Sequence, residues 1–311
     1  MNFKGSMVAL VTPFRNGRVD EAALAKLIHW HANQGTSAVV PCGTTGESAT
    51  LSTEEHERVI SLTVQASRGR LPVIAGTGSN NTVEAIELTK YAKRAGADAA
   101  LLIAPYYNRP TQEGLFLHFK AIAEAVDLPL IPYNIASRTG VNIEPETFAR
   151  LASACKNIVA VKEASGSLDQ MSRIRQLCGD RLTLISGDDA LTLPVLAIGG
   201  TGVISVVANL VPRDVTDLVA AFARRDLTTA RKLHEQLLPL IKACFIETNP
   251  IPVKTAMGLL HMIDPELRLP LCPMSALHLE QLRQALMHYG LLRPSGRPAT
   301  TPRRTKTTTA R

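Results

Sequence analysis

Cysteine and aromatic residues are scarce in this chain of 311 residues. The five cysteines are an odd number at wide spacings without a Cys-x-x-Cys pair, which argues against a disulfide framework and against a zinc site. His29 and His31 stand two apart on an expected helix and point to different faces, so they do not suit one metal ion. We therefore expect reduced thiols, no metal and no cofactor in a cytoplasmic protein.

The chain also lacks signals for secretion or membrane insertion. Its amino terminus has no basic stretch followed by an apolar core, which argues against a signal peptide. The longest uncharged run, residues 190–212, is interrupted by Pro194, by the glycine-rich residues 199–202 and by Asn209. This run is therefore expected to form a helix, a turn and a strand rather than a membrane span.

Positive charge is concentrated in the last residues. Residues 293–311 hold six basic residues and no acidic one, and removing these charges from the net charge of +7 leaves +1 for the rest of the chain. This tail has no apolar period, so we expect it to be disordered. An electrostatic contact of the tail with an acidic partner is the alternative, but the balanced charge of the body argues against nucleic-acid binding as the main function.

Eight short apolar runs alternate with helical patterns along the first two-thirds of the chain. The expected strands are residues 7–11, 37–40, 72–75, 99–104, 130–133, 158–162, 182–186 and 202–206. The first two helical patterns begin at Asp20 and at Ser52. The other six cover residues 82–95, 112–126, 145–154, 168–178, 190–198 and 212–223. Strands alternating with helices indicate parallel βαβ units, and eight such units close into an α/β fold of the (β/α)8 TIM-barrel type.

Three further helical patterns follow the eighth unit, at residues 228–245, 252–262 and 275–289. They predict a C-terminal helical appendix packed on the barrel. We therefore expect a catalytic barrel over residues 1–225, a helical subdomain over 226–292 and the basic tail over 293–311.

Lys162 ends the sixth apolar run. Active sites of such barrels lie at the carboxyl ends of the strands, and burial lowers a lysine pKa toward the neutral, nucleophilic amine. Lys162 is therefore a candidate nucleophile, and the alternative is an ordinary salt bridge with Glu163. Glu163 is the next residue along the strand, so its side chain should point the other way.

Polar groups follow several other expected strands. The Gly-Thr-Thr-Gly segment with Thr44 and Thr45 offers backbone amides and hydroxyls to a small anion, and a plain turn is the alternative. Tyr106, Tyr107 and Tyr133 all lie at strand ends, where a phenol either relays protons or only lines the rim.

Two charged motifs at the same mouth have competing interpretations. Arg138 follows the fifth strand and suits a carboxylate, with a surface salt bridge as the alternative. Asp188 and Asp189 follow the seventh strand, and we expect them to cap the next helix rather than to bind a metal.

Six motifs in order along residues 3–292 resemble the dihydrodipicolinate synthase family. They are Gly-Thr-Thr-Gly-Glu-Ser at 43–48, Tyr-Tyr-Asn-Arg-Pro at 106–110, Tyr-Asn with Ser-Arg-Thr-Gly at 133–140, Val-Lys-Glu-Ala at 161–164, Ser-Gly-Asp-Asp at 186–189 and Asn-Pro-Ile-Pro-Val-Lys at 249–254. The lysine and the threonine pair alone would indicate only the wider superfamily of pyruvate-dependent class I aldolases and lyases. A sister aldolase of N-acetylneuraminate lyase type or acting on a hydroxy-oxo acid is therefore the alternative.

The resemblance implies a lyase of lysine and diaminopimelate biosynthesis. Lys162 would form a Schiff base with pyruvate, whose enamine attacks L-aspartate 4-semialdehyde. Thr44, Tyr133 and Tyr107 would relay protons, with Tyr107 supplied by a neighbouring subunit of a homotetramer built from dimers.

The resemblance also assigns the binding residues. Thr45 would hold the pyruvate carboxylate and Arg138 the semialdehyde carboxylate, while Gly187 and Ile204 line the pocket. The positions that resemble a lysine effector site at the dimer interface are Ser48, Ala49, His56, Asn80, Glu84 and Tyr106.

Three positions depart from the family pattern. Thr53 replaces a histidine of some relatives, which leaves the strength of lysine inhibition open. Ala136 stands where a proline is common, which would loosen the loop that carries Arg138. Cys42 is unusual before the threonine pair, and it is either a reactive thiol or an inert buried residue.

Overall fold

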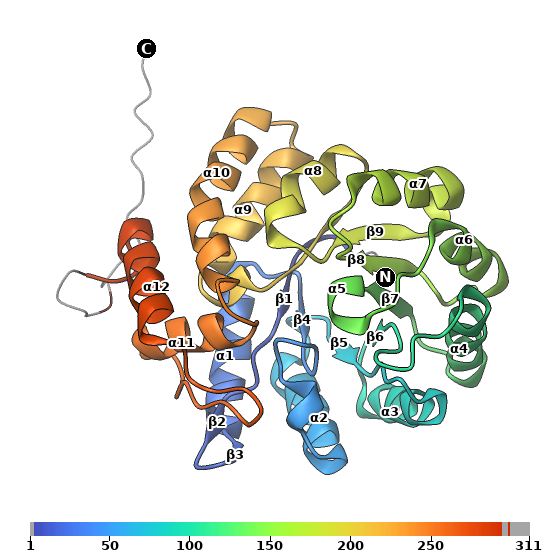
Figure 1. Cartoon of the computed structure of the whole chain (residues 1–311), viewed down its shortest axis with the longest axis horizontal. Helices are drawn as coiled ribbons and strands as arrows, with labels where there is room; N and C mark the ends of the chain where they lie inside the picture. Colours follow the sequence, from blue (N-terminus) through green and yellow to red (C-terminus); the bar gives the residue numbers. More distant parts are fainter. Residues whose placement is uncertain (1–2, 294–297, 299–311) are drawn as a thin grey trace.

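A computed structural model describes residues 3–293 and residue 298 of the chain, and its central feature is a barrel of eight parallel strands (Figure 1). The strands are β1 (Gly5–Ala9), β4 (Ala38–Val40), β5 (Ile74–Gly76), β6 (Ala99–Ile103), β7 (Leu130–Asn134), β8 (Ala160–Glu163), β9 (Thr183–Ser186) and β10 (Gly202–Ser205). They pair in the order β4-β1-β10-β9-β8-β7-β6-β5, and a parallel bridge between Val39 and Val73 closes the remaining gap. The predicted (β/α)8 TIM barrel is therefore confirmed.

Helices surround the strands as an outer layer (Figure 1). They are α1 (Glu21–Gln34), α2 (Thr53–Ser67), α3 (Thr82–Ala95), α4 (Gln112–Ala125), α5 (Ala136–Thr139), α6 (Pro145–Ala154), α7 (Leu168–Cys178), α8 (Thr192–Ala197) and α9 (Pro212–Ala223). Short 3-10 segments are η1 (Ser48–Thr50), η2 (Gly179–Arg181), η3 (Asp189–Leu191) and η4 (Val207–Asn209). The helix predicted over residues 190–198 is thus divided into η3 and α8, whereas the predicted capping box at Ser52 and Glu55 is present.

Side chains alternate between the two faces of each strand. On β6, Ala99 and Leu101 belong to the interior cluster of the barrel, while Ala100 and Leu102 pack outward in the cluster that includes the helices. On β8, Ala160 lies inside and Val161 outside. Because successive strand residues face opposite sides, the next residue, Lys162, points into the barrel.

Three helices follow the barrel, α10 (Leu227–Cys244), α11 (Ile251–Leu259) and α12 (Ala276–Tyr289), and they gather at one side of it (Figure 1). The predicted C-terminal appendix is confirmed, with α10 packed on α9 and α12 packed on α10. A two-stranded hairpin of β2 (Phe14–Arg15) and β3 (Arg18–Val19) was not predicted, because two-residue strands carry no period.

The basic tail predicted for residues 293–311 lies, except for residues 293 and 298, outside the described residues. Within the described part of the chain, every helix is too short or too polar to cross a lipid bilayer.

Candidate active site

Lys162 lies inside the barrel near the carboxyl end of β8. Its side chain is 6% exposed, and its Nζ is 4.0 Å from the centre of the Tyr133 ring on the neighbouring strand β7. Burial lowers the pKa of Lys162 to about 7; the Arg138 cation lowers it further, and the Asp189 carboxylate opposes the decrease. A large fraction of this amine is therefore neutral and nucleophilic at neutral pH.

Glu163 faces the outside of the barrel, as its place in the strand predicts. Its carboxylate accepts hydrogen bonds from Asn134 Nδ2 at 3.0 Å, from Ser165 N at 2.6 Å and from Gln170 Nε2 at 3.2 Å. These contacts hold the end of β8 from the side opposite to Lys162. The alternative in which Glu163 neutralises Lys162 is therefore wrong.

Tyr133 and Thr44 form the second part of the cluster. Burial raises the pKa of the Tyr133 phenol to about 12, although the nearby Arg138 cation and a hydrogen bond with the Thr44 side chain act in the opposite direction. The phenol therefore keeps its proton at neutral pH and is able to exchange it with the Thr44 hydroxyl. Thr44 lies in the turn after β4, where its carbonyl accepts the backbone N–H of Glu47 at 3.1 Å.

Thr45 and Arg138 share a partner that the sequence did not assign to the site. Asn249 donates its Nδ2 to the hydroxyl of the buried Thr45 at 3.0 Å, and its backbone carbonyl accepts a hydrogen bond from Arg138 Nη2 at 3.2 Å. Arg138 comes from α5 and lines a cavity that also contains Thr44 and Tyr133. Asn249 belonged to a recognised motif, but only its contacts with residues more than a hundred positions away show what it holds.

Gly187 lies beside Lys162 and Ile204 lies in the interior of the barrel, and neither is among the residues that line the cavity with Thr44, Tyr133 and Arg138. A methyl group added at Gly187 would lie 3.1 Å from Lys162 Cε and 2.8 Å from Ala164 Cβ, so the glycine leaves space beside the amine. Ile204 on β10 is buried in the same interior cluster as Tyr133.

Tyr107 is the predicted catalytic residue that its own chain does not bring into this cluster. Its side chain is 89% exposed and its backbone has a positive φ of 73°. Tyr133 and Thr45, in contrast, are buried. A phenol this exposed is available to a second molecule rather than to Lys162 of the same chain.

Most positions that resemble an effector site line the same cavity as Thr44, Tyr133 and Arg138. This cavity has a volume of about 350 Å³, and five of the six positions line it: Ser48, Ala49, His56, Glu84 and Tyr106. The sixth, Asn80, donates its side-chain amide to the Tyr106 carbonyl at 3.1 Å. A single hollow therefore connects Thr44 and Tyr133 with the effector candidates.

Two side chains at that end of the cavity have defined states. His56 donates Nε2–H to the Gly76 carbonyl at 2.7 Å, and burial lowers its pKa, which favours the neutral ring. Cys42 is buried, and burial raises the pKa of its thiol. Of the two interpretations of Cys42, the inert buried residue is the one that this environment favours.

The aspartates after β9 have structural partners. Asp188 caps η3 by accepting the backbone N–H of Ala190, and Asp189 accepts those of Val206 and Val207 at 2.8 and 3.2 Å. Across residues 3–293, the structure contains no group of three or more histidine, cysteine or acidic side chains arranged to hold a metal ion.

Known proteins share this fold and sequence over nearly the whole chain. A 4-hydroxy-tetrahydrodipicolinate synthase of Syntrophus aciditrophicus is 58% identical over 290 residues, which cover 93% of this chain and 99% of that protein. The crystal structure of dihydrodipicolinate synthase from Aquifex aeolicus is 51% identical with a TM-score of 0.92, covering 96% of this chain and 100% of that one.

Two similar structures contain ligands. One is the dihydrodipicolinate synthase of Acinetobacter baumannii complexed with pyruvate, at 46% identity and a TM-score of 0.90, covering 92% of this chain and 99% of that one. The other is the enzyme of Cyanidioschyzon merolae with lysine bound, at 44% identity and a TM-score of 0.90, covering 93% of this chain and 99% of that one. Residues 2–289 match the profile of the dihydrodipicolinate synthetase family, and the chain belongs to that family.

Proposed function

We propose that this protein is a 4-hydroxy-tetrahydrodipicolinate synthase, a lyase that condenses pyruvate with L-aspartate 4-semialdehyde in lysine and diaminopimelate biosynthesis. The observation that carries the proposal is the buried Lys162 amine, whose pKa of about 7 makes it nucleophilic beside Tyr133 and Thr44. The relatives named for this activity are 58% identical or less and align with nearly the whole chain, which supports the same chemistry here.

The proposed reaction begins at the amine of Lys162. Nζ attacks the carbonyl carbon of pyruvate, and loss of water gives a protonated Schiff base. Loss of a methyl proton then produces an enamine, whose carbon attacks the aldehyde of the second substrate. The amino group of that substrate finally displaces Lys162 from the imine carbon, which closes the ring and frees the lysine.

The neighbouring side chains move protons and hold carboxylates in this scheme. The neutral phenol of Tyr133 and the Thr44 hydroxyl carry protons to and from the reacting oxygen and carbon. Thr45 binds the pyruvate carboxylate, and Arg138 at the cavity receives the semialdehyde carboxylate. The glycine at 187 keeps the space that the substrate needs beside Nζ.

Borohydride reduction in the presence of pyruvate tests the role of Lys162. We expect a stable adduct on the peptide that contains Lys162, detected by mass spectrometry, and no adduct in a Lys162→Arg variant. An adduct on another lysine, or turnover by the variant at the wild-type rate, would contradict the proposal.

The alternative activity is that of a sister pyruvate aldolase acting on a sugar acid or hydroxy-oxo acid. Arg138, held by the Asn249 carbonyl at the cavity, favours the short semialdehyde with its own carboxylate. Turnover assays that offer the semialdehyde and the sugar acid side by side distinguish the two, and exclusive turnover of the sugar acid would overturn the synthase assignment.

We propose that the protein is a homotetramer in which Tyr107 completes the proton relay of a neighbouring subunit. Its 89% exposure on the single chain supports a role outside that chain. Mixing Tyr107→Phe subunits with Lys162→Arg subunits tests this directly, because only an exchange between subunits creates sites with both native residues. We expect activity to return on reassembly, and mixtures as inactive as the separate variants would refute the exchange.

We propose that lysine binds at the effector end of the cavity and inhibits the enzyme. Glu84 supports this proposal, because its carboxylate lines the cavity and suits the ammonium of a lysine ligand. Glu84→Gln should weaken lysine inhibition by about tenfold or more while leaving the pyruvate KM unchanged. Equal inhibition of the variant and the wild type would remove Glu84 from the site.

We propose that the protein works in the cytoplasm. Free cysteines support this location, since all five are unpaired and four of them are buried. Thiol titration of the purified, denatured protein without reductant should find five free thiols, and disulfide-linked peptides would contradict this expectation.

A further inference from the structure

Glu47 has an unusual position in the turn that carries Thr44 and Thr45. Its backbone has a positive φ of 53°, a conformation that is unfavourable for a residue with a side chain, and its carboxylate is completely buried. A backbone of this kind persists only where the surrounding contacts determine it. The partners of the Glu47 side chain are therefore the groups that fix the turn.

Two of these partners come from the C-terminal part of the chain. Lys254 on α11 donates its Nζ to Glu47 Oε1 at 2.6 Å, and both side chains are fully buried. The backbone N–H of Arg268 donates to Glu47 Oε2 at 3.2 Å. The ring of Phe14 completes the enclosure, with Lys254 Nζ and the Arg268 guanidinium each 4.3 Å from its centre.

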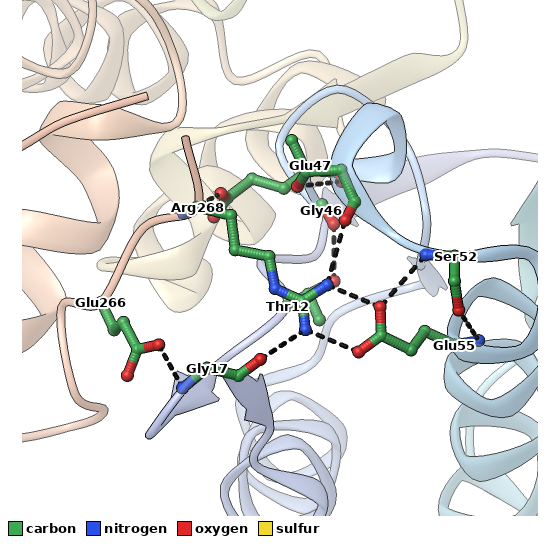
Figure 2. Close-up of polar contacts among 9 residues, drawn as sticks. Thr12, Gly17, Gly46, Glu47, Ser52, Glu55, Glu266 and Arg268 are labelled. Atoms are coloured by element: carbon green, nitrogen blue, oxygen red, sulfur yellow. Dashed lines mark hydrogen bonds and ion pairs between the residues drawn. The ribbon is translucent and has the colours of Figure 1, made fainter. Parts of the chain in front are cut away.

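The Arg268 side chain extends this contact to three further segments (Figure 2). Its two terminal nitrogens each donate to one oxygen of Glu55 at 2.6 Å, in the two-pronged geometry of a strong ion pair. They also donate to the Thr50 carbonyl at 3.0 Å and to the Gly17 carbonyl at 2.8 Å. One arginine thus connects the hairpin, the end of the turn and the start of α2.

The turn transmits these contacts to the catalytic residues. The backbone N–H of Glu47 donates to the Thr44 carbonyl. The Thr12 hydroxyl donates to the Gly46 carbonyl at 2.7 Å (Figure 2). The Thr44 side chain in turn contacts the Tyr133 phenol. A displacement of Glu47 should therefore shift Thr44 and its neighbour Thr45 relative to Tyr133, whereas Lys162 belongs to β8 and lies outside this turn.

We propose that Lys254 and Arg268 are positioning residues, which hold the turn at Glu47 so that the Thr44 hydroxyl stays against Tyr133. The inference rests on the proposed function, because it assigns the pair to the proton relay of that reaction. A shift of about 1 Å in a catalytic group lowers rates by about a hundredfold. Lys254 and Arg268 do not line the cavity themselves, whereas their partners Glu47 and Thr50 do. We therefore expect the loss to appear in kcat, measured at saturating pyruvate, where a weaker contact of Thr45 with the substrate has little effect.

The test compares Arg268→Lys and Lys254→Met with the wild type. Arg268→Lys keeps the charge but loses the fork on Glu55 and the bonds to the two carbonyls. We expect kcat to fall by about tenfold to a hundredfold in both variants. The extent of pyruvate adduct after long incubation with borohydride should stay at the wild-type level, because Lys162 is untouched.

Arg58→Lys is the matched control. Arg58 on α2 also forms a two-pronged contact, with Glu21 through Nε and Nη2 at 2.8 Å each, but both side chains are exposed. Its kcat should remain within about twofold of the wild type, since exposed ion pairs contribute little. Equal kcat values for Arg268→Lys, Lys254→Met and Arg58→Lys would overturn the proposal.

A double variant separates positioning from stability. Glu47→Leu with Lys254→Met replaces the buried ion pair by apolar groups, an exchange that commonly preserves or improves stability. We expect urea unfolding to show a stable double variant whose kcat stays low, and recovery of both stability and kcat would refute the positioning role. A wild-type protein that forms no pyruvate adduct would instead refute the proposed function itself.

Discussion

Replacing Lys162 by methionine should stabilise the folded chain and remove its nucleophile at the same time. Burial lowers the lysine pKa from its ordinary value of 10.5 to about 7, so the folded state binds the proton more weakly than the unfolded chain does. Folding therefore costs free energy at every pH at which the unfolded lysine is protonated. Methionine has a similar length and no charge, and it avoids this cost.

The magnitude depends on pH in a defined direction. The cost is about 5 kcal/mol below pH 6, about 4 kcal/mol at pH 7 and about 2 kcal/mol at pH 9. It is complete below the folded pKa of about 7 and disappears as the pH rises above the unfolded value of 10.5. The stability gained by Lys162→Met should therefore be large at pH 6 and should shrink steadily toward pH 9.

Urea unfolding of the wild type and Lys162→Met at pH 6, 7, 8 and 9, at one protein concentration, measures this difference. Lys156→Met is the control, because Lys156 is exposed on the segment before β8. The difference in stability between Lys156→Met and the wild type should be the same at each pH. A Lys162→Met variant that is less stable than the wild type, or whose gain is the same at pH 6 and pH 9, would refute the reasoning.

Three further substitutions test the rest of the site. Tyr133→Phe should lower kcat by about 10²–10⁴-fold in steady-state assays while urea unfolding changes little, because the variant loses the proton-carrying hydroxyl and keeps the ring; an unchanged kcat would exclude a relay through Tyr133. Asn249→Ala should raise the pyruvate KM about tenfold, since Thr45 loses a hydrogen bond of about 1–1.5 kcal/mol, and an unchanged KM would exclude a binding role for Thr45. Gly187→Ala should cost about 1–3 kcal/mol in urea unfolding and slow formation of the Lys162 adduct, because the added methyl group meets Lys162 Cε at 3.1 Å; trapping at the wild-type rate would contradict this reading of the pocket.

The barrel and the place of Lys162 were predictable because both are local properties of the chain. A strand buried on both faces is a continuous apolar run, and eight such runs with helices between them define the topology. The alternation of side chains then predicted correctly that Lys162 and Glu163 point to opposite faces. The exposed Tyr107 agrees with the expectation that another subunit uses it, which remains a prediction.

The contacts that support the site were not predictable by the same means. Glu47 and Lys254 are 207 residues apart, and Thr45 and Asn249 are 204 apart, so neither pair affects any local period. A buried glutamate after two threonines and a glycine has the pattern of a surface turn. Its burial depends on how the C-terminal segment returns to the barrel, and that is a property of tertiary packing.

The shared cavity constrains how this protein is able to evolve. In the proposed function, the turn after β4 supplies Thr44 to the reaction and Ser48 and Ala49 to the effector site, and all three residues line the same cavity. Under that proposal, a mutation in this turn should alter turnover and effector recognition together, so that selection cannot easily adjust one of them alone. Inherited differences in regulation should accumulate instead at Glu84, which lines the same cavity but comes from α3 and not from this turn.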